Sequence, residues 1–142
     1  MNYARLALAA VVAAVVDIVY GGLVYGMLLT SQFQAFPAVF RSTESQMAYL
    51  PSMFGGILIG IFAVTAIYAK GYEGGSGVAE GLRFGLLVAI FNAGYFVATS
   101  YAILNIGRAL TVSMAVAGLV EWLLVGATIG LFYKPLPAAA AR

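Results

Sequence analysis

The chain has 142 residues, of which 63% are hydrophobic and only 8% are charged, and its net charge is +2. A soluble domain is about one quarter charged, so this chain has too little polar surface to fold as a globule in water and is expected to lie mostly in lipid. It contains no cysteine and no histidine, which excludes disulfides, thiol chemistry, zinc sites built from these ligands and histidine-dependent catalysis.

Four apolar segments follow one another along the chain, and each is long enough to cross a membrane. About 20 helical residues span the roughly 30 Å of hydrocarbon, and helices are expected because lipid cannot pair with free backbone groups. The first segment is too long for the core of a signal peptide, and the last ends before Pro135. The sequence predicts an all-α, polytopic membrane protein that forms a single domain over residues 1–142, with its four helices in a compact bundle at 5–30, 51–70, 81–104 and 111–133.

The connection between the first two predicted helices is polar but carries regularly spaced large apolar residues. Their near-helical spacing is typical of a short helix lying on the outer leaflet, and a plain loop with aromatic anchors is the alternative. The residues concerned are Phe33, Phe36, Val39 and Phe40. Residues 43–46 read Thr-Glu-Ser-Gln, a capping-box pattern that would start the second helix early and bend it at Pro51.

The segment KGYEGGSG connects the second and third predicted helices and is predicted to be a turn. It does not end in the Gly-Lys-Ser/Thr of a phosphate-binding loop, and no strand is expected before it. Its glycines permit backbone conformations that other residues avoid, and Ser76 is expected to cap the third helix.

The distribution of basic residues predicts the orientation in the membrane. An even number of spans places both termini on one side, and that side receives Arg5, Lys70, Arg83, Lys134 and Arg142. The opposite side receives Arg41 and Arg108. Because basic residues concentrate in cytoplasmic segments, both termini are predicted to be cytoplasmic.

Each predicted span carries a pair of glycines four residues apart. The pairs are Gly22 and Gly26, Gly56 and Gly60, Gly81 and Gly85, and Gly126 and Gly130. Small residues at this spacing let helix backbones approach closely in lipid. We expect these pairs to pack the helices within one bundle, and homodimerisation through one such face is the alternative.

Three of the four spans place a strongly polar side chain near the middle of the membrane. Asp17, Asn92 and Glu121 each lie about 14–20 Å along their helices from the nearest predicted cytoplasmic end, given a rise of about 1.5 Å per residue. Residues at helical spacing from them extend this predicted polar layer: Tyr20, Tyr95, Thr99 and Thr128. No basic residue is expected at that depth, so at least one carboxyl must be neutral or a cation must lie between them. The layer is therefore either a proton or cation site, or a structural contact that sets helix register.

The segments IYAKGYEGGSGVAEGLRFGLLV and GLVEWLLVGATIGLFYKP resemble a group of small bacterial four-span integral membrane proteins of unknown function. The glycine-rich turn followed by GLRFGLL is the most recognisable part, and VVDIVYGGLVYG lies within the same resemblance. The resemblance implies a four-helix fold in the bacterial inner membrane. It implies no activity, cofactor or site residues.

Two functions are compatible with these patterns. The first is a non-enzymatic accessory or structural subunit, packing against other membrane proteins, lipids or pigments, or against copies of itself. The alternative is a small oligomeric transporter coupled to protons or cations through Asp17 and Glu121. An enzyme is not expected, because no nucleophile or metal-ligating set accompanies the carboxylates. No cofactor, no metal site and no nucleic-acid partner are predicted.

Overall fold

The computed structural model describes residues 1–133, and within that range the regular structure is entirely helical. In chain order the elements are α1 (Tyr3–Leu23), η1 (Val24–Leu28), α2 (Thr30–Gln34), α3 (Thr43–Gln46), η2 (Met47–Tyr49), α4 (Leu50–Lys70), α5 (Gly77–Phe91), η3 (Asn92–Ala98), α6 (Thr99–Ile103) and α7 (Arg108–Phe132). Two of these segments, η1 and η3, are π-helical, and η2 is a turn of 3-10 helix.

These elements join into four helices that are long and apolar enough to cross a membrane. Their bounds are Tyr3–Leu28, Thr43–Lys70, Gly77–Ile103 and Arg108–Phe132. The prediction of four long apolar helices is confirmed, and each helix begins before its predicted start. Hydropathy marks only the part of a helix that lies in hydrocarbon, whereas hydrogen bonding continues into the polar first turns.

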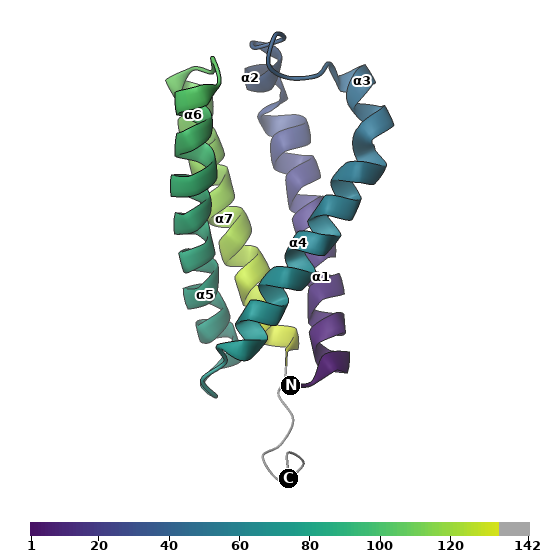
Figure 1. Ribbon diagram of the computed structural model, residues 1–142, viewed down its shortest axis with the longest axis vertical. Coiled ribbons are helices and arrows are strands. Elements are labelled where there is room, and N and C mark those ends of the chain that lie inside the picture. Colours follow the sequence, from purple (N-terminus) through teal and green to yellow (C-terminus); the bar gives the residue numbers. More distant parts are fainter. Residues whose placement is uncertain (134–142) are drawn as a thin grey trace.

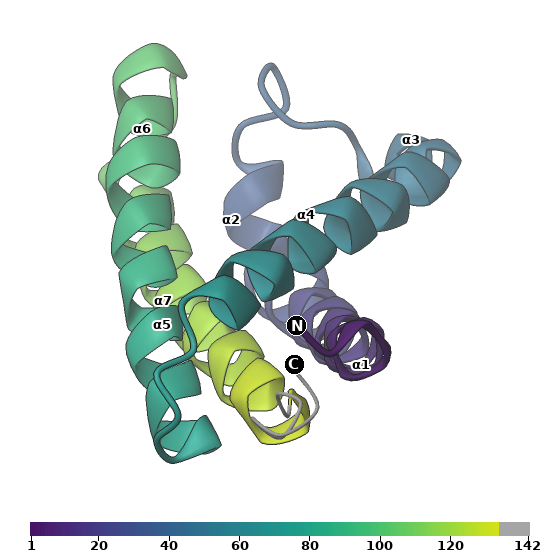
Figure 2. The same cartoon turned by 60° about the horizontal axis from the view of Figure 1, so that its bottom comes forward.

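The four helices form an open row and not the compact bundle that was predicted. The main packing pairs are α5 with α7, α7 with α1, and α1 with α4, so α5 and α4 are the outer helices of the row. They meet near the end where α1 begins, where the Tyr68 ring of α4 packs against the Phe84 ring of α5. Figures 1 and 2 show α4 crossing α1 obliquely and diverging from the other helices toward α3. The first helix begins and α7 ends at the same end of the molecule (Figure 1).

The buried core lies near the end of the molecule at which α1 begins. There α1 presents a stripe of four alanines, at most 1% exposed: Ala9, Ala10, Ala13 and Ala14. Because an alanine side chain is only a methyl group, α4 and α7 can both approach α1 closely along this stripe. An aromatic cluster closes the same end, with the Tyr68 ring 5.4 Å from that of Phe84 and 6.0 Å from that of Tyr133.

Glycines bring α5 and α7 into backbone contact. A Cβ atom added at Gly81 would collide with the carbonyl oxygen of Gly126, and one added at Gly85 would collide with that of Trp122. Gly130 faces Gly77 in the same way. The two predicted glycine pairs of the third and fourth spans therefore lie directly opposite each other at one antiparallel helix contact.

The glycine pairs of the first two spans are placed differently. A Cβ atom at Gly22, Gly56 or Gly60 would have no neighbour within 4 Å, and one at Gly26 would meet only the carbonyl oxygen of Gly21 in its own helix. The expectation that these four glycines pack helices together within the chain is wrong for residues 1–133. Among residues 1–133, these faces of α1 and α4 therefore have no close neighbour.

The connection between the first two spans differs from the predicted interfacial helix. α2 includes only Phe33 of the four regularly spaced residues, and Phe36, Val39 and Phe40 follow it outside any helix. The Phe33 and Phe40 rings meet edge to face with centroids 4.9 Å apart. Phe36 reaches the turn before α7, where its ring lies against Gly107. These aromatic residues thus pack against the chain itself.

The second span begins early, as the capping-box pattern predicts, but Ser42 caps it and not Thr43. The Ser42 hydroxyl accepts a hydrogen bond of 3.3 Å from the Ser45 backbone N–H. The helix then tightens into η2 before Pro51 enters the first turn of α4. A Ser42 cap satisfies one of the backbone donors left free at a helix start.

In the glycine-rich turn, Gly74 has a φ of +90°, a conformation that favours glycine. Ser76 occupies the N-cap position of α5 but makes no capping hydrogen bond, contrary to the prediction. The carboxylate of Glu80 instead reaches back and accepts a hydrogen bond from the Gly75 backbone N–H. Glu80, in the first helical turn of α5, therefore connects the glycine-rich turn to the helix.

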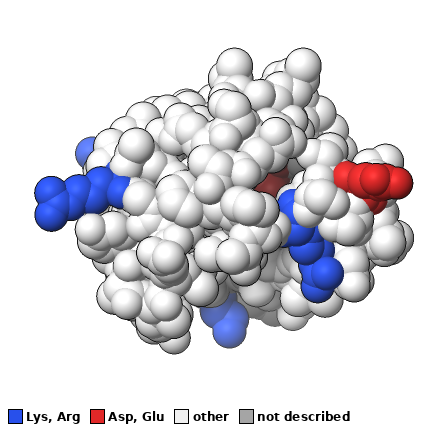
Figure 3. Space-filling view, turned by 90° about the horizontal axis from the view of Figure 1, so that it is seen from above, with Lys and Arg blue, Asp and Glu red and all other residues white. Residues whose placement is uncertain are grey.

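The end of the molecule that carries α2, α3 and the α6–α7 turn has few charges. Figure 3 views this end and shows a few basic and acidic side chains on a surface that is otherwise uncharged. Both arginines predicted for this side contact a tyrosine. The Arg41 guanidinium lies 3.8 Å from the centre of the Tyr49 ring, and Arg108 Nε donates to the Tyr101 hydroxyl over 3.4 Å. Tyrosine and arginine together are typical of a membrane–water boundary.

A candidate polar cavity between three spans

The strongest polar contact inside the row joins the first and last spans. Glu121 on α7 accepts a hydrogen bond of 2.9 Å at Oε2 from the hydroxyl of Tyr25, which lies in the π-helical segment η1. The other carboxylate oxygen, Oε1, faces Gly21 of α1. A Cβ atom added at Gly21 would lie 4.0 Å from Oε1, an ordinary contact distance, so the carboxylate lies against α1 at this position.

Asp17 lies beside this contact but in a more enclosed place. It is 8% exposed and continues the buried alanine stripe of α1, one turn beyond Ala13 and Ala14. Tyr20, one turn further along, donates a hydrogen bond of 2.9 Å to the backbone carbonyl of Ala117. Two carboxyl groups and two phenols therefore meet where α1 crosses α7.

Asn92 reaches the same region from the third span. A Cβ atom added at Gly118 would lie 2.7 Å from Asn92 Nδ2 and 3.9 Å from the Tyr25 hydroxyl oxygen. Glycine at position 118 is therefore needed for the amide to lie against α7. Asn92 also begins η3, and π-helical turns inside α-helices are frequent at functional sites.

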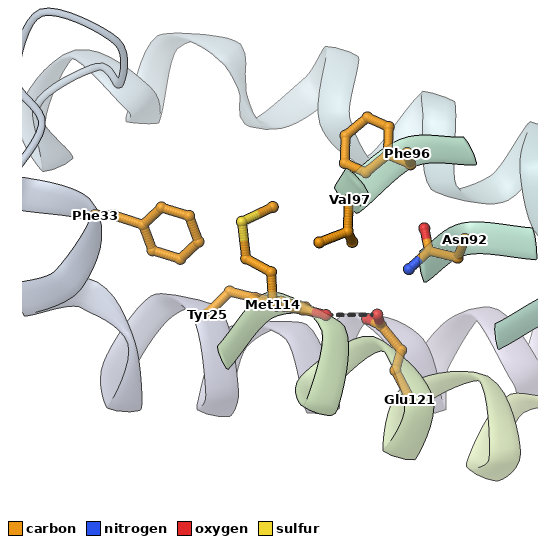
Figure 4. Close-up of a pocket in the computed structure, with 7 residues that line it drawn as sticks. All are labelled: Tyr25, Phe33, Asn92, Phe96, Val97, Met114 and Glu121. Atoms are coloured by element: carbon orange, nitrogen blue, oxygen red, sulfur yellow. Dashed lines mark hydrogen bonds between the residues drawn. The ribbon is translucent and has the colours of Figure 1, made fainter. Parts of the chain in front are cut away.

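These polar groups form one side of a half-open cavity of about 250 Å³. Its lining residues come from four segments of the chain: Tyr25, Phe33, Asn92, Phe96, Val97, Met114 and Glu121. In Figure 4 the side chains of Phe33, Met114, Val97 and Asn92 converge on the same space, and the Tyr25–Glu121 hydrogen bond borders it. Asp17 is not among the lining residues.

The structure brings together four of the seven residues predicted for the polar layer: Asp17, Tyr20, Asn92 and Glu121. Tyr95, Thr99 and Thr128 are elsewhere. Tyr95 is 70% exposed and its ring stacks on that of Phe91, with centroids 5.2 Å apart. The prediction assumed a regular α-helix beyond Asn92, and η3 changes which residues share a face with it.

The two threonines bond within their own helices. The Thr99 hydroxyl donates to the backbone carbonyls of Tyr95 and Phe96, and the Thr128 hydroxyl donates to that of Leu124 over 2.8 Å. A threonine in a helix commonly satisfies its hydroxyl through the preceding turn in this way. Neither hydroxyl is therefore directed at the carboxyl groups.

Sequence reasoning missed five of the lining residues: Tyr25, Phe33, Phe96, Val97 and Met114. Tyr25 had a detectable signal, since it is a polar aromatic residue in the same apolar segment as Asp17. Phe33 was assigned to the membrane surface, and nothing in its spacing indicated that the α2 segment would fold over a cavity. Met114 is one apolar residue among many in the fourth span.

The chemistry available in the cavity is that of a carboxyl group, a phenol and an amide surrounded by apolar walls. No basic side chain is among the lining residues. Within residues 1–133, no three histidine, cysteine, aspartate or glutamate side chains are grouped so as to hold a metal ion. The arrangement can hold a proton or accommodate a positively charged group at Glu121.

No protein-family model matches the sequence, and no curated protein and no solved structure matches it either.

Proposed function

We propose that this multi-pass membrane protein is a non-enzymatic accessory or structural subunit in the bacterial inner membrane. The observation that carries the proposal is the pair of unpacked glycine faces, Gly22 with Gly26 on the first span and Gly56 with Gly60 on the second. A transmembrane helix of another subunit, or of a second copy of the chain, packs against them. Lipid covers the remaining apolar surface.

The energetics of glycine support this role. Glycine inside a helix costs about 1 kcal/mol relative to alanine, so it is a poor choice where nothing approaches it. Between α5 and α7 the cost is offset by close backbone packing. The same spacing on α1 and α4 serves the same purpose once a partner helix is present, because lipid tails cannot match the fit of another backbone.

A photo-activatable amino acid at Ile59, which is 74% exposed beside Gly60, tests the proposal in native membranes. We expect a cross-linked product with a protein, and we expect Gly60→Leu to remove it, because the larger side chain keeps a helix at a distance. The same photo-probe at Leu87, exposed on α5, is the matched control and should yield lipid adducts only. A product at Ile59 that Gly60→Leu leaves unchanged contradicts the proposal.

The orientation of the subunit follows from its basic residues. Arg5, Lys70 and Arg83 lie at the end where α1 begins, and Arg41 and Arg108 lie at the opposite end. Lys134 and Arg142 fall outside the described residues. Reporter fusions at residue 75 and at the C-terminus should both score as cytoplasmic, and a fusion at residue 38 should score as external. The reverse pattern would overturn the proposed orientation.

A second candidate function is a small oligomeric transporter coupled to protons or cations. The observation that favours it is the Tyr25–Glu121 contact at the edge of the cavity, together with the buried acid Asp17 on the same span as Tyr25. Ionisable side chains within a membrane commonly mark ion or proton pathways. This role is compatible with assembly through the glycine faces.

A further inference from the structure

We propose that the cavity between η1, η3 and α7 binds a small alkylammonium ion, with the positive charge at Glu121 and the alkyl groups against the aromatic walls. The proposal goes beyond the subunit role. It also deepens the second candidate function, on which it rests, by naming the chemical class of its ligand.

The charge of the site selects a cation. Glu121 is the one carboxyl group among the lining residues, and Asp17 is a second buried acid on the first span. All basic side chains in the described part of the chain belong to residues near the helix ends: Arg5, Arg41, Lys70, Arg83 and Arg108. A carboxylate in a lipid environment without a counter-charge is costly, and a bound cation removes that cost.

The walls select an alkylated cation over an inorganic one. Three aromatic rings line the cavity, those of Tyr25, Phe33 and Phe96, together with the apolar side chains of Val97 and Met114. The faces of aromatic rings attract ammonium groups, which is the basis of aromatic cages for quaternary ammonium ligands. A metal ion that gives up its water needs several protein oxygen ligands, and this wall offers few.

The dimensions suit a compact ligand. A volume of about 250 Å³ is below the roughly 300–1,000 Å³ of sites for drug-sized molecules. Phe33 lies on the short α2 segment, held against Phe40, and covers one side of the space. Asn92 faces the cavity from η3 and can orient a polar substituent of the ligand.

The test measures binding to the purified full-length chain in mild detergent. The probes are choline and its neutral carbon isostere 3,3-dimethyl-1-butanol, which have the same shape and differ in charge. We expect saturable choline binding by calorimetry and binding of the isostere at least about tenfold weaker, since a tenfold difference corresponds to about 1.4 kcal/mol. Glu121→Gln should weaken choline binding to a similar extent.

Two further variants separate the site from the fold. Phe33→Leu removes a ring from the wall without touching the carboxyl and should weaken choline binding about three- to tenfold. Glu73→Gln is the matched control, because it also removes one acid but lies in the turn after α4 and not in the cavity wall. It should leave choline binding unchanged. Thermal unfolding, followed by the fluorescence of the single tryptophan, establishes that each variant is folded.

The outcomes are distinct. Equal affinity for choline and its isostere, absence of saturable binding to the folded wild-type chain, or full binding by folded Glu121→Gln would each overturn the proposal. If Glu121→Gln does not fold, the comparison of the two probes and the Phe33→Leu variant decide. Choline binding without choline-driven proton movement in vesicles upholds the site and rejects the transporter function. Cross-linking at Ile59 tests the subunit role independently.

Discussion

Replacing Gly126 by alanine is expected to destabilise the protein by about 1–3 kcal/mol, and replacing it by leucine is expected to prevent normal packing of α5 on α7. The added Cβ atom would collide with the carbonyl oxygen of Gly81 and would lie 2.7 Å from the Cα atom of Gly85. Both obstacles are backbone atoms, which cannot move aside as a flexible side chain can. The two helices would have to separate along their shared face.

The matched control is Gly60→Ala, the same change in another membrane-spanning helix. Its Cβ atom would have no neighbour within 4 Å. In detergent, away from any partner, Gly60→Ala should be neutral or stabilising by up to about 1 kcal/mol, because alanine is the better helix former. Thermal unfolding monitored by circular dichroism measures both variants. Equal destabilisation at the two positions would show that close backbone packing between α5 and α7 contributes nothing specific.

Replacing Glu121 by leucine is expected to destabilise the chain by about 1–3 kcal/mol, because the Tyr25 hydroxyl loses its acceptor inside the molecule. Adding Tyr25→Phe to Glu121→Leu should recover most of the loss, since removing both partners of a hydrogen bond leaves no unpaired group. Glu121→Gln retains an acceptor oxygen and should be the mildest of the three changes. Unfolding free energies of the single and double variants, combined in a double-mutant cycle, measure the coupling.

Additive losses in that cycle would mean that the two side chains are not coupled in the folded state. A large loss in Glu121→Gln alone, with an intact Tyr25, would instead indicate that the negative charge stabilises the protein. The cycle measures stability and is therefore separate from the choline experiment, which measures binding by folded variants. Together they distinguish a structural contact from a ligand site.

The helical class and the approximate course of the four spans could be predicted from the sequence, because the constraint that decides them is local. A segment of sufficient length and hydropathy must satisfy its backbone within itself when it lies in lipid. Depth along a helix is also local, since each residue adds about 1.5 Å. Asp17, Asn92 and Glu121 accordingly lie near the middle of their helices.

Which side chains face a neighbouring helix depends on the rotation of each helix about its axis, and local sequence does not determine that rotation. The predictions of shared helix faces were therefore wrong in part. Tyr95 shares a predicted face with Asn92 only if the helix stays regular, and the π-helical segment η3 breaks that register. Tyr25 enters the site through the corresponding segment η1 of the first span. Neither segment is marked by proline, and nothing in the local composition indicates where a helix will widen.

The glycine pairs show most directly the difference between what local sequence determines and what tertiary structure determines. All four spans carry the same four-residue spacing, so the sequence by itself determined where close helix packing was available. Only the tertiary structure decided where the chain uses it: Gly81 and Gly85 meet Gly126 and Gly130, while Gly56 and Gly60 meet nothing. The reason is that a helix contact depends on two surfaces. The row places α5 against α7 but leaves this face of α4 without a neighbour among residues 1–133.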